Sequence, residues 1–154
     1  GGGAVREADC PRTMSGKTWP PAEPPGLDAK AKALRIHHYQ RVRSGNECCV
    51  MLYHMLPVEA ALEITEQWFQ AENGVIRMPG AADPIAGSHC IKIIQCDLRF
   101  GFFFVNSWGR QWWNGGFGLL PFEYFDKYLV SAWTQHGPLS LPDYYLFSLH
   151  AYCL

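Results

Sequence analysis

Residues 87–109 read GSHCIKIIQCDLRFGFFFVNSWG, and this segment carries the most informative pattern in the chain. Two arms rich in β-branched, apolar and aromatic residues flank a candidate turn at 97–99, and this pattern predicts an antiparallel β-hairpin. With a two- or four-residue turn centred just after Asp97, His89 lies directly opposite Asn106, and their Cβ atoms are about 5 Å apart.

The paired His89 and Asn106 are candidate catalytic residues. A histidine whose ring nitrogen is held by an amide oxygen is an oriented general base, which lacks only a group to activate. Trp108, two residues after Asn106, can shield this hydrogen bond from water. A single histidine is more often a packed core residue, but the opposed amide favours a catalytic-type position.

The hairpin and the sequence after it resemble the C-terminal domain of papain-like cysteine peptidases. That family has a catalytic His at the start of a strand and a catalytic Asn in an Asn-Ser-Trp-Gly motif. The motif continues, so that the whole run reads Asn-Ser-Trp-Gly-x-x-Trp-Gly-x-x-Gly-aromatic. Residues 106–117 match this run, except that Trp113 replaces the second motif glycine. The resemblance covers residues 45–133 well and residues 18–44 loosely.

The resemblance implies an α+β fold, a papain-like C-terminal half with an antiparallel β-barrel-like sheet and one or two short helices. It implies that His89 is the general acid and base of peptide-bond hydrolysis and that Asn106 orients its ring. In the family, the histidine forms an ion pair with a low-pKa thiolate that attacks the peptide carbonyl. The implied substrate is a peptide or protein, with no cofactor. The implied substrate-face positions are Ser88, Cys90, Trp108 and Trp112.

The family's nucleophile motif, a Gln followed by Gly-x-Cys-Trp, does not occur in this sequence. Cys90 and Cys96 are an odd number of residues from His89, which predicts that they point to the opposite face of a regular strand. Burial of an apolar run at 48–53 would raise the pKa of its thiols. Cys10 is a weak candidate nucleophile, since its Pro-rich surroundings lack the helix N-terminus that would lower a thiol pKa.

Two functional interpretations therefore stay open. In the first, the chain supplies the His and Asn of a Cys-His-Asn peptidase, and the cysteine half lies on a missing segment or a separate partner chain. In the second, the chain is an inactive pseudopeptidase that binds proteins with the former substrate face. Lys92, where the family has an apolar residue, and the pair at 95–96, where it has Gly-aromatic, are departures that weigh against activity.

Composition excludes several other classes. The chain has 154 residues, 48% of them hydrophobic, which suits one domain with an ordinary core. The net charge of −1 offers no basic field for nucleic acid. No apolar run reaches the roughly 18 residues of a membrane span, and the N-terminus has no signal-peptide pattern, which leaves the compartment unknown. The six cysteines have no CxxC spacing, so a metal site is not expected, whereas disulfides stay open.

The domain boundaries follow from composition and the resemblance. Residues 1–27 read as a Pro-rich leader or interdomain segment, residues 28–133 as the papain-like domain and residues 134–154 as an apolar tail of unknown role. Within the domain, the other expected elements are helices at 29–34 and 57–69, strands at 35–42, 48–53, 115–121 and 130–133, and a turn at 122–125.

Overall fold

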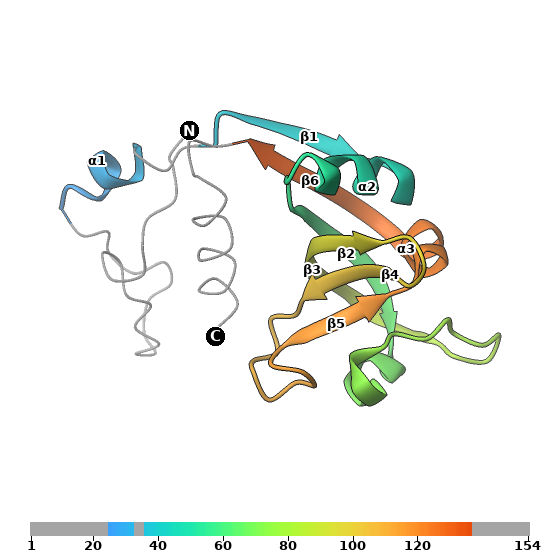
Figure 1. Cartoon of the computed structure of the whole chain (residues 1–154). Coiled ribbons are helices and arrows are strands. Elements are labelled where there is room, and N and C mark those ends of the chain that lie inside the picture. Colours follow the sequence, from blue (N-terminus) through green and yellow to red (C-terminus); the bar gives the residue numbers. More distant parts are fainter. Residues whose placement is uncertain (1–24, 33–35, 137–154) are drawn as a thin grey trace.

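The computed structural model describes residues 25–32 and 36–136 (Figure 1). Its centre is one six-stranded antiparallel sheet with the strand order β1-β6-β2-β3-β4-β5. The strands are β1 (His38–Val42), β2 (Val58–Thr65), β3 (Ile85–Asp97), β4 (Gly101–Val105), β5 (Phe117–Leu120) and β6 (Leu129–His136). The predicted strands at 35–42, 115–121 and 130–133 are thus confirmed as β1, β5 and β6. Most of the predicted leader and tail, Cys10 included, falls outside the described residues.

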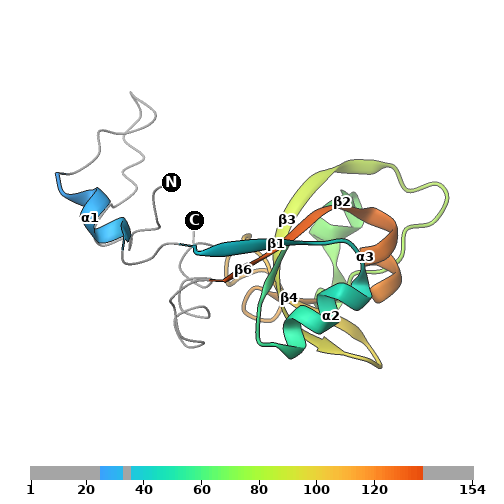
Figure 2. The ribbon, with the colours of Figure 1, turned by 90° about the horizontal axis from the view of Figure 1, so that it is seen from above.

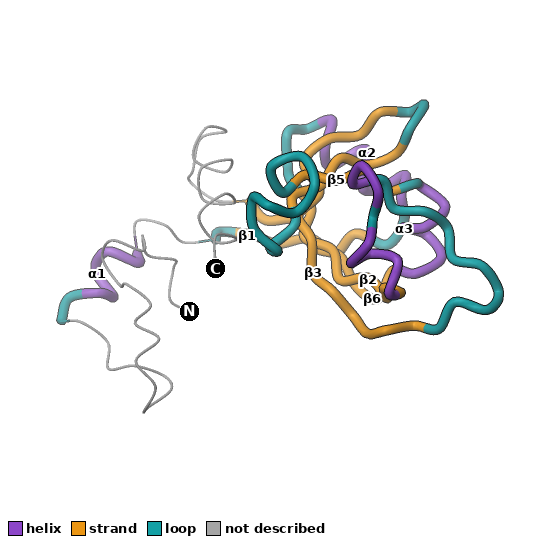
Figure 3. The backbone as a smooth tube through the Cα atoms, turned by 90° about the horizontal axis from the view of Figure 1, so that it is seen from below, coloured by secondary structure: helices purple, strands orange, loops and turns teal. Residues whose placement is uncertain are grey.

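Short helices complete the α+β fold. They are α1 (Leu27–Lys32), α2 (Gly45–Tyr53), η1 (Glu66–Gln70), η2 (Glu72–Gly74) and α3 (Phe122–Tyr128). Helices α2 and α3 contact each other and the sheet, and Figures 2 and 3 show them together on one side of it. The core fills the space between them and the strands. Its largest fully buried side chains are Trp68, Tyr124, Phe102, Phe104, Phe125 and Leu62.

The helix predicted at 57–69 is wrong, because most of this segment is strand β2. Burial alternates along β2, with Val58, Ala60, Leu62 and Ile64 buried, while Glu63 is exposed. This is the two-residue period of a strand with one face on the core, rather than the 3.6-residue period of a helix. β2 pairs with both β6 and β3, so its backbone hydrogen bonds are made within the sheet. Only η1, after β2, is helical.

The strand predicted at 48–53 is also wrong, because this run lies in helix α2. Ser44 caps the helix, and its side-chain oxygen accepts a hydrogen bond from the backbone N–H of Glu47 at 3.2 Å. Cys48 and Leu52, four residues apart, are buried on one helix face, whereas Val50 is exposed. The Ser-x-x-Glu spacing at 44–47 is a helix-start pattern, whereas the strand prediction rested on the apolar run alone. The turn predicted at 122–125 is likewise the start of a helix, α3.

The β3–β4 hairpin is confirmed, but its register differs from the predicted one. The turn spans three residues, 98–100, and a β-bulge interrupts the pairing between Ile93 and Gln95. Lys92 pairs with Val105, so His89 and Asn106 are not directly opposite each other. Beyond the bulge, the residues of β3 point to the opposite sheet faces from those that regular alternation would give. Cys96 consequently pairs with buried Phe102 and packs on the core side, contrary to the prediction.

Lys92, an apolar position in the family, lies on the sheet face away from the core. Its Nζ is 3.1 Å from Oε1 of Glu59, the residue paired with it on β2. The lysine side chain is only 13% exposed, while that of Glu59 is 44% exposed. A cross-strand pair of opposite charge is compatible with a sheet, which explains how the lysine is accommodated.

Candidate active site

His89 and Asn106 are in direct contact. Nε2 of His89 is 2.8 Å from Oδ1 of Asn106. His89 lies in β3 beside Leu62 of β2, and Asn106 follows the last residue of β4. The backbone N–H of Asn106 donates to the carbonyl oxygen of Gly116 at 2.8 Å, which holds this position against the strand that follows. The contact is therefore made diagonally across the hairpin rather than between opposed residues.

The hydrogen bond defines which ring nitrogen of His89 can act as a base. An amide oxygen only accepts hydrogen bonds, so Nε2 of His89 is the donor and carries the hydrogen. In the neutral imidazole, Nδ1 then carries the lone pair and is the proton-accepting atom. Asn106 is only 2% exposed, and its Nδ2 is buried with no hydrogen-bond partner among the described residues.

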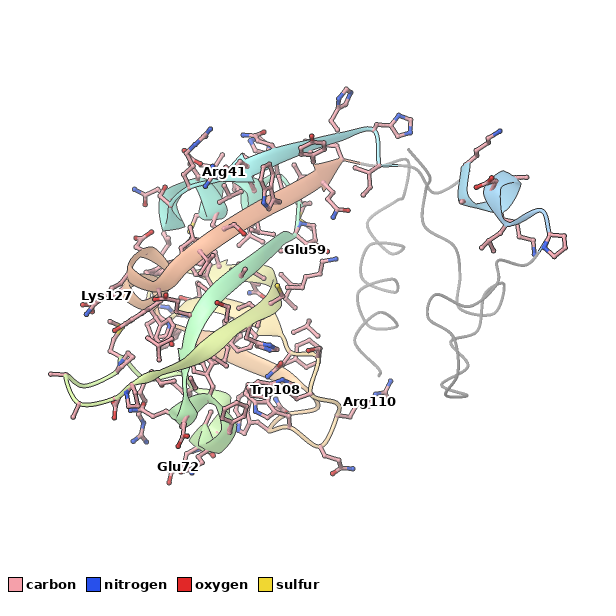
Figure 4. All side chains as sticks on the ribbon, turned by 180° about the vertical axis from the view of Figure 1, so that it is seen from behind. Arg41, Glu59, Glu72, Trp108, Arg110 and Lys127 are labelled. Atoms are coloured by element: carbon pink, nitrogen blue, oxygen red, sulfur yellow. The ribbon has the colours of Figure 1, made fainter. Side chains whose placement is uncertain are left out.

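Aromatic rings enclose His89. Trp108 stacks on the imidazole, with ring centroids 4.6 Å apart and an interplanar angle of 28°. Trp68 meets it edge-on at 6.1 Å. Phe69 in turn stacks on Trp108 at 4.9 Å. Figure 4 shows Trp108 at the same end of the sheet as Glu72 of η2. The aromatic surroundings limit water at the His89–Asn106 bond.

Trp68 and Phe69 are parts of the site that sequence reasoning missed. The predicted helix at 57–69 includes them, and both do lie in the short helix η1, but the helical pattern gives them no role at the site. Two adjacent aromatics directly after an alternating segment are the signal that could have indicated a strand ending just before a functional surface. Trp68 is anchored on its far side, because its Nε1 donates to Oη of Tyr124 at 2.8 Å. Tyr124 Oη donates onward to the backbone oxygen of Glu63 at 3.0 Å. This chain of bonds fixes the Trp68 ring beneath His89.

Burial shapes the proton affinity of the site. It lowers the pKa of His89, and the hydrogen bond to Asn106 offsets this only in part. The imidazole is therefore predominantly neutral near pH 7, the form that can accept a proton. Burial also raises the pKa of Cys49 to about 12 and raises that of Cys48 further. Neither thiol is suited to form a thiolate near neutral pH.

We expect the lowered pKa of His89 to make stability depend on pH. Just below pH 6.5 the unfolded chain binds more protons than the folded chain, so the free energy of unfolding falls as the pH drops through this range. The free energy of unfolding stops falling once the pH is below the pKa of His89 in the folded chain. His89→Gln should remove this component from urea unfolding curves measured between pH 5 and 7.5. His54→Gln, an exposed position, is the matched control. Equal pH dependence in both variants would contradict the lowered pKa.

The other predicted site residues are spread over two surfaces. Trp112 meets Trp108 edge-on at 5.8 Å and so belongs to the aromatic group around His89. Ser88 and Cys90 are exposed on β3 on either side of His89, and Cys90 pairs with Ala61 on the sheet face away from His89. Within residues 25–32 and 36–136, no three His, Cys, Asp or Glu side chains gather as a metal site. No helix in those ranges is long and apolar enough to cross a membrane.

Trp113, which replaces a motif glycine, has a backbone conformation that favours glycine. Its φ is 37°, in the left-handed region that other residues rarely adopt. A Cβ built on Gly74 would lie 1.8 Å from the Trp113 ring, so the indole covers Gly74 closely. The missing side chain at Gly74 thus makes room for Trp113, and packing on η2 compensates for the strained backbone.

Comparison with known proteins agrees with this geometry. Models of known protein families give no match. A gut-specific cysteine proteinase of Caenorhabditis elegans is 30% identical over 92 residues, which are 58% of this chain and 27% of that protein. Xylellain, a cysteine protease from Xylella fastidiosa, superposes with a TM-score of 0.74 at 19% identity, over 86% of this chain and 56% of xylellain. Digestive procathepsin L 3 of Tenebrio molitor superposes with a TM-score of 0.64 at 17% identity, over 87% and 44%.

The sheet, its short helices and these similarities define the class of the protein. The chain has the fold of the C-terminal domain of papain-like cysteine peptidases. The resemblance to that family inferred from residues 87–117 is thus confirmed for the fold. It spans about a quarter of the curated relative that it matches and about half of xylellain.

Proposed function

We propose that the chain supplies the histidine and asparagine of a cysteine-type peptidase. His89 acts as general base and general acid, and Asn106 orients its ring. The observation that carries this proposal is the 2.8 Å hydrogen bond between His89 Nε2 and Asn106 Oδ1, in an enclosure of aromatic rings. It leaves Nδ1 as the basic atom of a neutral imidazole, as proton abstraction from a thiol requires.

The reaction proposed is hydrolysis of a peptide bond in a peptide or protein substrate. Nδ1 of His89 takes the proton of a cysteine thiol, and the thiolate attacks the carbonyl carbon. The imidazolium then gives its proton to the leaving amine, and an acyl-thioenzyme forms. Water, deprotonated by the same imidazole, hydrolyses the thioester. Asn106 keeps the ring aligned in both steps because its oxygen accepts from Nε2 throughout.

The nucleophile of this reaction comes from outside the described residues. The described cysteines are Cys48, Cys49, Cys90 and Cys96. Cys48 and Cys49 have raised pKa values, Cys90 faces away from the imidazole, and Cys96 lies at the other end of β3. We propose that the nucleophile belongs to a further segment or to a separate cysteine-bearing partner chain.

The purified chain is therefore expected not to hydrolyse peptides and not to react with an epoxide probe for papain-like thiolates. Extending the expressed product through the adjacent upstream coding sequence should add a Gly-x-Cys-Trp motif and confer both reactions. His89→Ala should then abolish them, whereas His54→Ala should leave them unchanged. Labelling of Cys10 in the chain alone, lost in His89→Ala, would contradict the proposed source of the nucleophile.

A protein-binding pseudopeptidase is the second candidate. It is favoured by Trp113, which is 40% exposed where the family motif has a glycine. An exposed indole is a common anchor in protein interfaces. The upstream sequence separates the two candidates, because a product whose motif lacks the cysteine would support binding rather than catalysis.

A further inference from the structure

We propose that Cys49 and Cys96 are a redox-sensitive pair that forms a disulfide between helix α2 and strand β3. The two residues are far apart in sequence, yet their Sγ atoms are 2.7 Å apart. Both are partly buried and pack against the core, where α2 lies on the sheet. The proposal concerns the stability of the domain and does not depend on the proposed peptidase function.

The separation of the sulfurs favours bond formation. Non-bonded heavy atoms normally rest about 3.5–4.0 Å apart, so the two sulfurs are already closer than ordinary packing. A disulfide bond is about 2.05 Å long. Closing it requires the sulfurs to approach by only about 0.6 Å.

The fold selects these two thiols over their neighbours. Cys48, adjacent in sequence, is fully buried on the core-facing side of α2. Cys90, on the same strand as Cys96, is exposed. The β-bulge between Ile93 and Gln95 turns Cys96 toward the helix, whereas a regular strand would direct it to the opposite face.

The oxidant we propose is a low-molecular-weight disulfide such as oxidised glutathione. One protein thiolate attacks a glutathione sulfur and releases one glutathione thiolate, and the second protein thiolate then displaces the other. Two protein thiols and one glutathione disulfide thus give one protein disulfide and two glutathione thiols. Because burial and the neighbouring Cys96 raise the pKa of Cys49 to about 12, the exchange is slow near pH 7 and accelerates at higher pH.

The cross-link would stabilise the fold without touching the candidate active site. It closes a loop from 49 to 96 that contains β2 and most of β3, and it restricts the unfolded chain accordingly. Cys96 is seven residues along β3 from His89, about 23 Å at the rise of a strand. Oxidation should therefore change stability while leaving the His89–Asn106 contact unchanged.

The test is to oxidise the folded chain with glutathione disulfide at pH 8.5, alkylate the remaining thiols under denaturing conditions and map the peptides by fragmentation mass spectrometry. We expect a Cys49–Cys96 cross-link. We also expect the oxidised chain to melt about 10 °C higher than the reduced chain. Cys49→Ser and Cys96→Ser should each abolish this difference, and the matched control Cys90→Ser should retain it. An oxidised wild-type chain with alkylated Cys96, or with Cys96 linked to another cysteine, would overturn the proposal.

Discussion

Trp68→Ala is expected to destabilise the domain by about 3–5 kcal/mol, the range for removing a large buried aromatic side chain. Trp68 is 1% exposed and touches the rings of His89, Phe104 and Tyr124. The substitution leaves a cavity at the centre of the core and removes the hydrogen bond to the hydroxyl of Tyr124. The loss should appear as a lower midpoint in urea unfolding.

The matched control for Trp68→Ala is Phe69→Ala, the next residue in the chain. Phe69 is 60% exposed and stacks on the ring of Trp108, so its loss should cost about 1 kcal/mol or less. Trp68→Ala should also raise the pKa of His89 toward its ordinary value, because it opens the buried side of the imidazole. Similar unfolding midpoints for the two variants would show that Trp68 does not support the core.

Gly101→Ala is expected to cost about 3 kcal/mol of stability, from backbone strain and a steric clash together. Gly101 begins β4 with a φ of 124°, and a Cβ built there would lie 2.2 Å from the backbone oxygen of Leu120. Backbone oxygen cannot rotate away as a side chain can, so β4 and β5 must separate where they pair. Thermal unfolding measured by circular dichroism would report the loss.

Gly115→Ala separates the two causes. Gly115 also has a positive φ, 67°, but no atom lies within 4 Å of an added Cβ. This variant should lose only the strain component, about 1 kcal/mol. If Gly101→Ala is no more harmful than Gly115→Ala, the close approach of β5 to Gly101 does not limit the fold.

The hairpin could be predicted because its information is local. The motif after Asn106, the aromatic second arm and the turn residues all lie within residues 87–117. They indicate the papain-like class and bring His89 near Asn106. The predicted register was nevertheless wrong, because a three-residue turn and a bulge are selected by how β3 and β4 pack on the core. His89 and Asn106 are nevertheless in contact, because both lie at the same end of the hairpin and their side chains meet diagonally across it.

The helix and strand assignments at 48–53 and 57–69 were interchanged because neither segment is decided by its own residues. A short apolar run is compatible with a buried strand or with a helix that has one face on the core. The Ser44 cap favours the helix locally. β2 becomes a strand because β3 and β6 pair with its two edges, and those partners lie far along the chain.

The class of fold, the His89–Asn106 pair and the ring that stacks on His89 can all be inferred from the amino-acid sequence, since they depend on a motif within a single segment. The tertiary structure was needed to bring Trp68 against His89, to pair Lys92 with Glu59, and to bring the sulfurs of Cys49 and Cys96 together. Each of these contacts joins elements from distant parts of the chain. They arise when the sheet and its helices bury a common core, and such long-range packing has no signature in the spacing of neighbouring residues.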